Sequence, residues 1–174
     1  MPEISFVFDR TPEDLSRAKE LIDKVKNNGY SSLSNEEKAE WDNGLKACRN
    51  ASDLNRIGNA CNIIAGIMYN GNLIPEQMHI KDDWTMTEVP NVWEIENLLG
   101  FISVLRAAVQ KYDNTIPKVP YNPINTIEKM NLVERILYEV YNITNIILTD
   151  RQVCGEDYRC YSESQVPDLD GRLI

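Results

Sequence analysis

Apolar residues recur at helical spacing in five segments of the chain, about 11–29, 34–48, 52–69, 91–112 and 125–147. Residues three and four positions apart lie on one face of a helix, so this spacing predicts helices with one apolar side. The third segment shows it most clearly, with apolar residues alternately three and four apart: Leu54, Ile57, Cys61, Ile64 and Met68. Its apolar side is also the widest, which predicts a central helix.

Four of these segments begin with a residue that caps helices, followed three positions later by an acid. The pairs are Thr11 with Asp14, Ser34 with Glu37, Asn91 with Glu94 and Asn125 with Glu128. Such pairs satisfy backbone N–H groups that the first turn of a helix leaves without partners. Gly29 and Gly71 follow the first and third segments, where glycine commonly ends a helix.

The spacing of the apolar residues favours helices that pack nearly antiparallel at shallow angles, as in bundles. Only Arg49 and Asn50 separate the second segment from the third, so we expect these two helices to form a hairpin. The prediction is therefore an all-α domain, a bundle-like arrangement of five helices with a long central loop.

Three regions do not fit a helix. Residues 4–8 alternate apolar and small side chains, which predicts a short strand or an extended arm. Residues 71–90 are long for a loop, so we expect them to be packed against the helices or to be functional. The domain prediction is an extended N-terminal arm at 1–10, one helical domain at 11–150, and a polar, partly disordered tail at 151–174.

The composition is that of a globular protein, with 43% hydrophobic and 26% charged residues. The 27 acidic and 18 basic residues give a net charge of -9, which repels phosphate backbones and argues against nucleic acid as a partner. No apolar run approaches the roughly 20 residues that cross a bilayer, and no secretory signal is visible, so we expect neither membrane insertion nor export.

Four cysteines divide into two pairs with different surroundings. Cys48 and Cys61 lie on apolar faces of predicted helices and are expected to behave as small core residues. Cys154 and Cys160 flank Gly155 in the polar tail, where a local disulfide could form. Free thiols are the favoured interpretation, because a chain made in a reducing cytosol rarely retains disulfides.

No set of residues with the spacing of a catalytic or metal site stands out. His79 is the only histidine, and no cysteine lies close enough in sequence to join it in a metal site. The chain has no glycine-rich phosphate loop, and its many carboxylates lack a neighbouring histidine or nucleophile. We therefore expect a protein that is not an enzyme and that holds no metal or other cofactor.

The aromatic residue in the long loop is the strongest candidate for a binding role. Trp84 lies between Asp83 and Met86, so these three residues form a candidate contact for a partner protein. The alternative is that Trp84 packs the loop onto the helices, which is favoured because tryptophan is usually well buried. Trp41 and Trp93 are expected in the core or at its margin.

Several short strings of residues, taken in their order and spacing, indicate a resemblance to known proteins. They are Asp9-Arg10-Thr11, Leu33 to Trp41, Gly44-Leu45-Lys46, Ser52 to Arg56, Asp83-Trp84-Thr85, Val89-Pro90, Val133 to Leu137 and Gly155-Glu156. Together they resemble a family of helical domains in tail-associated, minor structural proteins of phages and prophages of Gram-positive gut bacteria. The resemblance covers residues 9 to about 156.

This resemblance implies a structural, non-enzymatic role in a virion, with other virion proteins or further copies of the chain as partners. The protein would be made in the bacterial cytoplasm and assembled into the particle. Asp53 and Arg56 are interpreted as architectural, with Asp53 capping a helix and Arg56 pairing with an acid of the first or second helix. The alternative function is a host-directed effector or regulatory adaptor that binds a bacterial protein.

Overall fold

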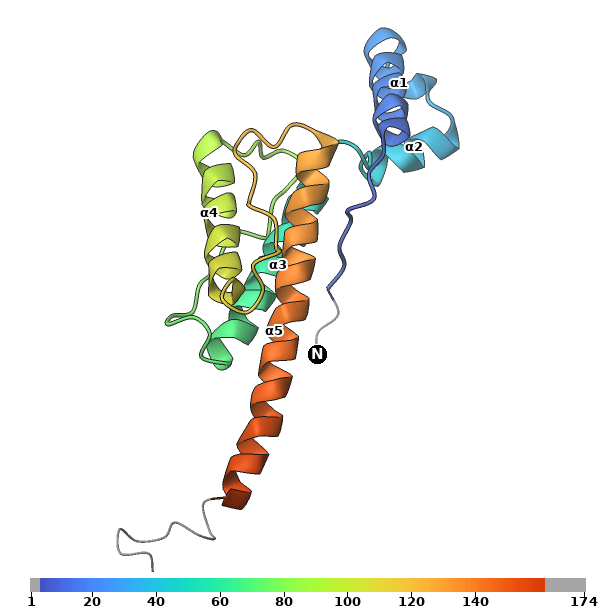
Figure 1. Ribbon diagram of the computed structural model, residues 1–174. Coiled ribbons are helices and arrows are strands. Elements are labelled where there is room, and N and C mark those ends of the chain that lie inside the picture. The colour runs from blue at the N-terminus through green and yellow to red at the C-terminus, as the bar shows by residue number, and fades with distance from the viewer. Residues whose placement is uncertain (1–3, 162–174) are drawn as a thin grey trace, which may run out of the picture.

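The computed structural model describes residues 4–161, with side chains up to Asp150, as five α-helices and one short 3-10 helix (Figure 1). The elements are α1 Pro12–Asn28, η1 Tyr30–Ser32, α2 Asn35–Asp42, α3 Ala51–Asn70, α4 Val92–Val109 and α5 Ile127–Tyr161. No β-strand occurs within residues 4–161, so the prediction of an all-α, five-helix domain is confirmed. Residues 4–11 form an extended arm, which was one of the two predicted alternatives.

Helix starts follow the capping signals in the sequence. Reciprocal hydrogen bonds between the capping residue and the acid three positions later occur at α1, α2, α3 and α4. At α5, Thr126 takes the place expected for Asn125, because its Oγ1 accepts a hydrogen bond from Lys129 N at 3.3 Å. The same helix continues to Tyr161, so the predicted boundary at Asp150 is not the end of the helix. Residues 162–174 of the predicted tail lie outside the described residues.

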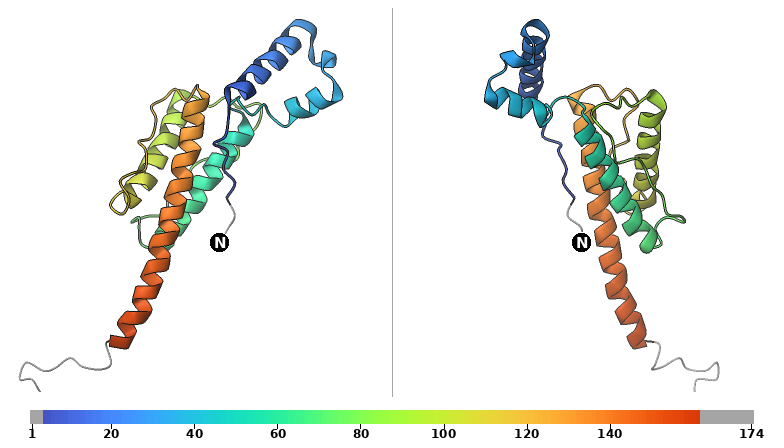
Figure 2. Two further views of the ribbon diagram at one scale, coloured as in Figure 1. Left: turned by 45° about the vertical axis from the view of Figure 1, so that its right-hand side comes forward. Right: turned by 180° about the vertical axis from the view of Figure 1, so that it is seen from behind.

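The second helix is shorter than predicted. Gly44 has a φ of +88°, a backbone conformation that favours glycine, and α2 has already ended at Asp42. Residues 43–50 therefore form a turning connection, and α2 lies beside α1 in a lobe set apart from the other helices (Figure 2). The predicted hairpin of the second and third helices is wrong, because this connection directs α3 away from the lobe.

Helices α3, α4 and α5 lie side by side and run in the same direction (Figures 1 and 2). Near their starts, Arg56 of α3 contacts Glu134 of α5, and beyond the end of α3, Gly71 lies against Leu148. The predicted antiparallel packing is therefore wrong for these three helices. The spacing of apolar residues defines which face of a helix is buried but not the direction of the neighbouring helix, which depends on the connection.

The long connections make this parallel arrangement possible. The 18 residues of α4 span about 27 Å, a distance that an extended chain covers in roughly eight residues. Residues 71–91 return along α3, and residues 110–126 return along α4. The long loop predicted from the sequence is thus the segment that carries the chain back to the start of the next helix.

Two asparagines of α3 hold the first return connection against the helix. Asn62 accepts a hydrogen bond from Ile80 N at 2.8 Å and donates one to Ile80 O at 2.9 Å. Asn55 makes the same pair of bonds with the backbone of Trp84, at 2.6 and 2.8 Å. These two residues are seven positions apart, which places them on one face of the helix. The middle of the connection is therefore held against α3 at Ile80 and at Trp84.

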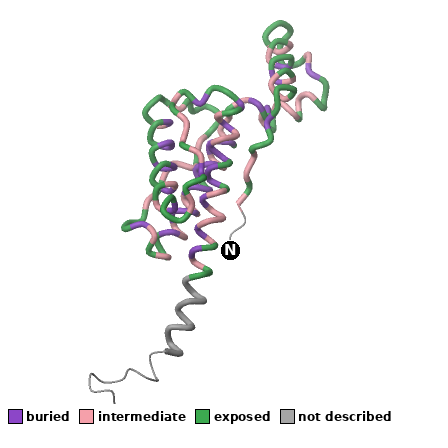
Figure 3. The backbone as a smooth tube through the Cα atoms, in the orientation of Figure 1, coloured by how far each residue is buried: buried purple, intermediate pink, exposed green. Residues whose placement is uncertain are grey.

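The buried apolar side chains form two separate clusters. The larger one lies between α3, α4 and α5, and its most buried large members are Ile64, Met68, Ile102, Leu105, Ile136 and Leu137. The smaller one lies in the α1–α2 lobe and comprises Ala18, Leu21, Leu33, Leu45, Ala47 and Ile127. Trp41 is half-buried against the smaller cluster, and Ile127, which belongs to α5, is a member of it. Figure 3 shows buried positions both in the lobe and in the larger body.

The close approach of the return connection to α3 can be tested at Gly58. A Cβ atom at Gly58 would lie 2.5 Å from the backbone oxygen of Lys81, whereas one at Gly66 meets nothing within 4 Å. We expect Gly58→Ala to lower the free energy of unfolding by about 1–3 kcal/mol, because the connection must move. Gly66→Ala should raise it by up to about 1 kcal/mol, because alanine favours the helix.

Urea denaturation of both variants measures the difference. Equal effects of the two substitutions would contradict the packing of residues 71–91 against α3.

Candidate functional site

Two arginines and two carboxylates meet in the interior, where the arm, α3 and α5 come together. We call Arg10, Asp53, Arg56 and Glu134 the arginine–carboxylate cluster. The side chain of Arg10 has no exposed surface and that of Glu134 is 1% exposed. Buried charges are costly unless they are paired and hydrogen-bonded, and the two positive and two negative groups here balance.

Arg10 uses its guanidinium donors fully within the protein. Its Nη2 donates to Asp53 Oδ1 and to Glu134 Oε1, both at 2.9 Å. Its Nε donates to the backbone oxygen of Lys46 at 2.9 Å, and its Nη1 donates to that of Val7 at 2.6 Å. One side chain therefore joins the arm, the connection before α3, α3 itself and α5.

Arg56 completes the cluster from the second turn of α3. Its Nη2 and Nε donate to the two carboxylate oxygens of Glu134 at 2.7 and 3.1 Å, and Nη2 also bonds to Asp53. Burial by itself lowers the pKa of Arg56, but the bonds to Glu134 and Asp53 outweigh it and raise that pKa. The predicted partner in the first or second helix is wrong, because α1 and α2 lie in the separate lobe.

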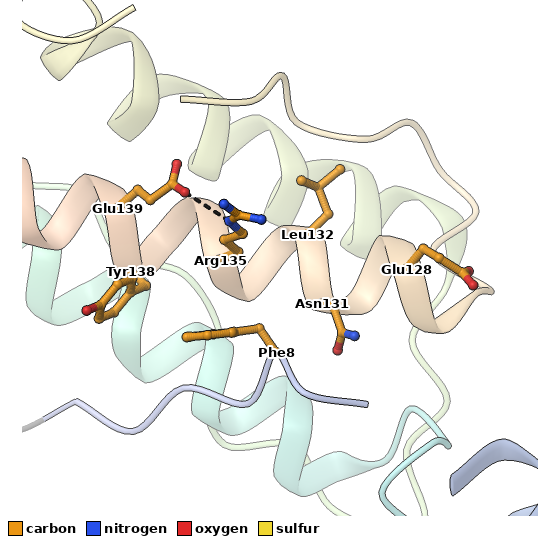
Figure 4. Close-up of a pocket in the computed structure, with 7 residues that line it drawn as sticks. All are labelled: Phe8, Glu128, Asn131, Leu132, Arg135, Tyr138 and Glu139. Atoms are coloured by element: carbon orange, nitrogen blue, oxygen red, sulfur yellow. Dashed lines mark hydrogen bonds and ion pairs between the residues drawn. The ribbon is translucent and has the colours of Figure 1, made fainter. Parts of the chain in front are cut away.

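A groove of about 550 Å³ runs between the arm and α5 (Figure 4). Phe8 faces Tyr138 with ring centroids 5.5 Å apart, and Arg135 Nε donates to Glu139 Oε1 at 3.0 Å. Its other lining residues are Glu128, Asn131 and Leu132. None of the seven is a serine, cysteine or histidine, so the groove offers rings and paired charges that suit contact with another surface.

A second recess, which we call the tryptophan cleft, lies between residues 79–84 and the start of α4. It has a volume of about 210 Å³, and Trp84 and Trp93 line it together with Lys81 and Glu94. Lys81 Nζ lies 4.4 Å from the centroid of the Trp84 ring, an arrangement in which the cation is attracted to the ring face. Lys81 also pairs with Glu88 at 2.6 Å, and this hydrogen bond raises the pKa of Lys81.

Of the three predicted contact residues, only Trp84 lines this cleft, and the three differ in exposure. Trp84 is half-buried and packs against the larger apolar cluster, while its backbone is held by Asn55. Asp83 is exposed, and Met86 is 75% exposed. Trp84 thus packs the loop onto the helices and at the same time forms one wall of the cleft.

The prediction that Trp93 lies at the core or its margin is wrong, because this side chain is 67% exposed. Trp93 precedes the first core residue of α4, Ile95, by two positions, which is about 200° around a helix. The same periodicity that identified the core face of α4 therefore places Trp93 on the opposite face. The spacing of the core residues along α4 is the sequence signal that indicates this exposure.

Four further large apolar side chains at or beside the start of α4 are exposed, and of these only Met86 was a predicted contact. Val92 is 66% exposed, Val89 88% and Tyr121 88%, and Asn122 Nδ2 donates to Val92 O at 3.4 Å, which brings Tyr121 close. We call this set the α4 apolar patch: Met86, Val89, Val92, Trp93 and Tyr121. An exposed group of large apolar side chains is typical of an interaction surface.

The cysteines and the histidine occupy unrelated positions. Cys48 and Cys61 are free thiols, and burial raises the pKa of both, so that neither is a reactive thiolate. The side chains of Cys154 and Cys160 lie outside the described residues, and so does the disulfide that the sequence allows between them as the less favoured alternative to free thiols. His79 lines the tryptophan cleft, and Asn62 Nδ2 lies 3.4 Å from its Nε2.

Across the described residues, no group of three His, Cys, Asp or Glu side chains could hold a metal ion. None of the helices in that part of the chain is long and apolar enough to span a bilayer. Comparisons with protein-family models, with curated proteins and with solved structures find no match for this chain.

The structural importance of the arginine–carboxylate cluster can be tested by removing one cation. We expect Arg10→Met to lower the free energy of unfolding by about 3–5 kcal/mol, because it leaves buried carboxylates with one cation between them. Arg135→Met is the matched control, since Arg135 is 64% exposed and its pair with Glu139 should contribute less than about 1 kcal/mol.

Both free energies come from urea denaturation. An effect of Arg10→Met no larger than that of Arg135→Met would show that the cluster does not hold the arm in place.

Proposed function

We propose that this chain is a non-enzymatic interaction module of a phage or prophage particle, which binds other virion proteins through the α4 apolar patch. The observation that supports binding at this place is the exposure of Trp93, Met86, Val89, Val92 and Tyr121 at one end of α4. The virion setting is supported by the resemblance of the sequence strings to tail-associated phage proteins.

The composition of the patch suits a protein partner. Tryptophan, tyrosine and methionine are enriched in the centres of protein interfaces, and tryptophan in particular contributes much of the binding free energy where it is buried. Trp93 lines the tryptophan cleft and is also exposed, so a partner side chain can enter this recess next to the Trp93 ring. A recess beside a large aromatic residue is the local geometry of many interface centres.

The support beneath the patch is rigid, which favours tight association. Asn91 caps α4 with Glu94, and Asn55 holds the backbone of Trp84 at 2.6 and 2.8 Å. A surface that is already ordered loses less conformational entropy when it binds. Val92 and Trp93 therefore lie on a helix whose start is already ordered before a partner binds.

The buried charges of the protein have structural partners, and this also supports a role in contact. Arg10, Arg56, Asp53 and Glu134 pair with one another, and Arg10 also binds the arm. Glu88 pairs with Lys81 at the surface. The charged groups of the arginine–carboxylate cluster and of the Lys81–Glu88 pair therefore stabilise the fold.

Replacement of the exposed tryptophan should weaken assembly without weakening the fold. We expect Trp93→Ser to reduce the amount of the chain in purified particles by at least about tenfold, since a central aromatic contact is lost. Thermal unfolding should change little, because Trp93 is 67% exposed in the free protein. The measurement is quantitative mass spectrometry of particles assembled with each variant.

Tyr69→Ser is the control, because Tyr69 is 41% exposed and lies at the other end of the parallel helices. Equal incorporation of all three proteins would contradict binding through the patch. Absence of the unaltered chain from particles, together with its retention by a host protein, would instead favour the host-directed alternative.

A further inference from the structure

The negative charge of the protein is concentrated around the α4 apolar patch. Residues 71–100 contain six carboxylates and one lysine, a net charge of -5 out of -9 for the whole chain. The segment comprises the return connection and the first half of α4, and it also carries four of the five exposed apolar side chains of the patch, Met86, Val89, Val92 and Trp93. A surface of this kind attracts cationic groups over several ångströms and repels acidic ones.

Three of these carboxylates, Glu76, Asp83 and Glu96, have no hydrogen bond or ion pair within the described part of the chain, and of the three Asp83 and Glu96 lie closest in sequence to Trp84 and Trp93. Glu88 pairs with Lys81, Glu94 caps α4, and Asp82 accepts a hydrogen bond from Asn62. For Asp83 and Glu96, the described part of the chain shows neither a hydrogen bond nor an ion pair. Both are exposed and therefore available to a positively charged group from outside.

Glu96 is placed to act together with Trp93. The two residues are three positions apart on α4, so their side chains emerge next to each other on one face of the helix. Trp93 is 67% exposed and makes no ring contact within the described residues. An aromatic face beside a carboxylate is a favourable site for a lysine or arginine side chain.

The neighbouring cleft already contains this kind of interaction within the chain. Lys81 lies 4.4 Å from the centre of the Trp84 ring and also pairs with the carboxylate of Glu88 at 2.6 Å. Trp93 and Glu96 offer the same two groups, a ring and a carboxylate, without a cation of their own. The difference is that their cation would have to come from a partner.

We infer that the α4 apolar patch binds a cationic, amphipathic segment of a partner protein. One arginine or lysine of that segment stacks on Trp93 and pairs with Glu96, while its apolar side chains cover Met86, Val89 and Tyr121. This inference rests on the proposed function and adds the chemistry of the partner. Nucleic acid and anionic lipid do not fit this patch, because their phosphates would meet the same carboxylates.

The test uses the full chain and three amphipathic peptides of equal length and equal leucine content. Their polar positions are arginine, glutamine or glutamate, and binding is followed by the fluorescence of the tryptophans and by calorimetry. We expect the arginine peptide to bind most tightly, the glutamate peptide least, and the preference to shrink as salt screens the charges.

Variants of the chain separate a specific site from the general attraction of an acidic protein. Glu96→Gln should weaken the arginine peptide by about 2- to 5-fold, whereas Glu36→Gln, with the same change in net charge on α2, should not. Trp93→Leu should weaken it by about 2- to 5-fold, because it keeps an apolar side chain but removes the ring, while Tyr69→Leu should have no effect.

The possible results lead to different conclusions. Equal binding of the arginine and glutamine peptides, still weakened by Trp93→Leu, would overturn the cationic preference and leave the apolar contact of the proposed function standing. Equal weakening by Glu96→Gln and Glu36→Gln, or no binding of the arginine peptide at all, would also overturn the inference. None of these results would change what the incorporation of Trp93→Ser into particles says about the proposed function.

Discussion

A guanidinium group with no exposed surface must find all its hydrogen-bond partners inside the protein, because a buried donor without one is costly. Arg10 meets this requirement with Asp53, Glu134 and two backbone oxygens, and these partners come from segments far apart in the chain. Its position therefore defines where the arm, α3 and α5 lie relative to one another. Arg56 supplies the second cation that the two carboxylates need.

The second constraint is the parallel direction of α3, α4 and α5. Parallel helices need return connections, and a return connection that lies on the surface needs partners for its backbone. Within residues 71–91, Asn55 and Asn62 supply them for Trp84 and Ile80. Because the connection is held in this way, Trp84 comes to lie at the start of α4 beside Trp93, and the tryptophan cleft is a consequence of the topology.

Buried charged groups and exposed apolar groups have different roles in this molecule. The charges in the interior are balanced and paired, so they stabilise one arrangement of the segments and offer little to a ligand. The apolar side chains at the end of α4 remain exposed, and unpaired carboxylates such as Glu96 accompany them. An interior closed by ion pairs and a surface with unsatisfied apolar and acidic groups together suit a protein that acts by contact.

Local interactions explain what the sequence by itself determined: the existence of five helices, the capping pairs that start α1, α2 and α4, and the buried faces of α3, α4 and α5. These depend on side chains three or four positions apart, as with Asn91 and Glu94 or Leu54 and Ile57. Only the tertiary structure decided the direction of the helices, the separation of the α1–α2 lobe, the union of Arg10 with Glu134 and the exposure of Trp93. Each of these follows from contacts between distant segments, and helical periodicity has no information about which distant segment will supply the partner.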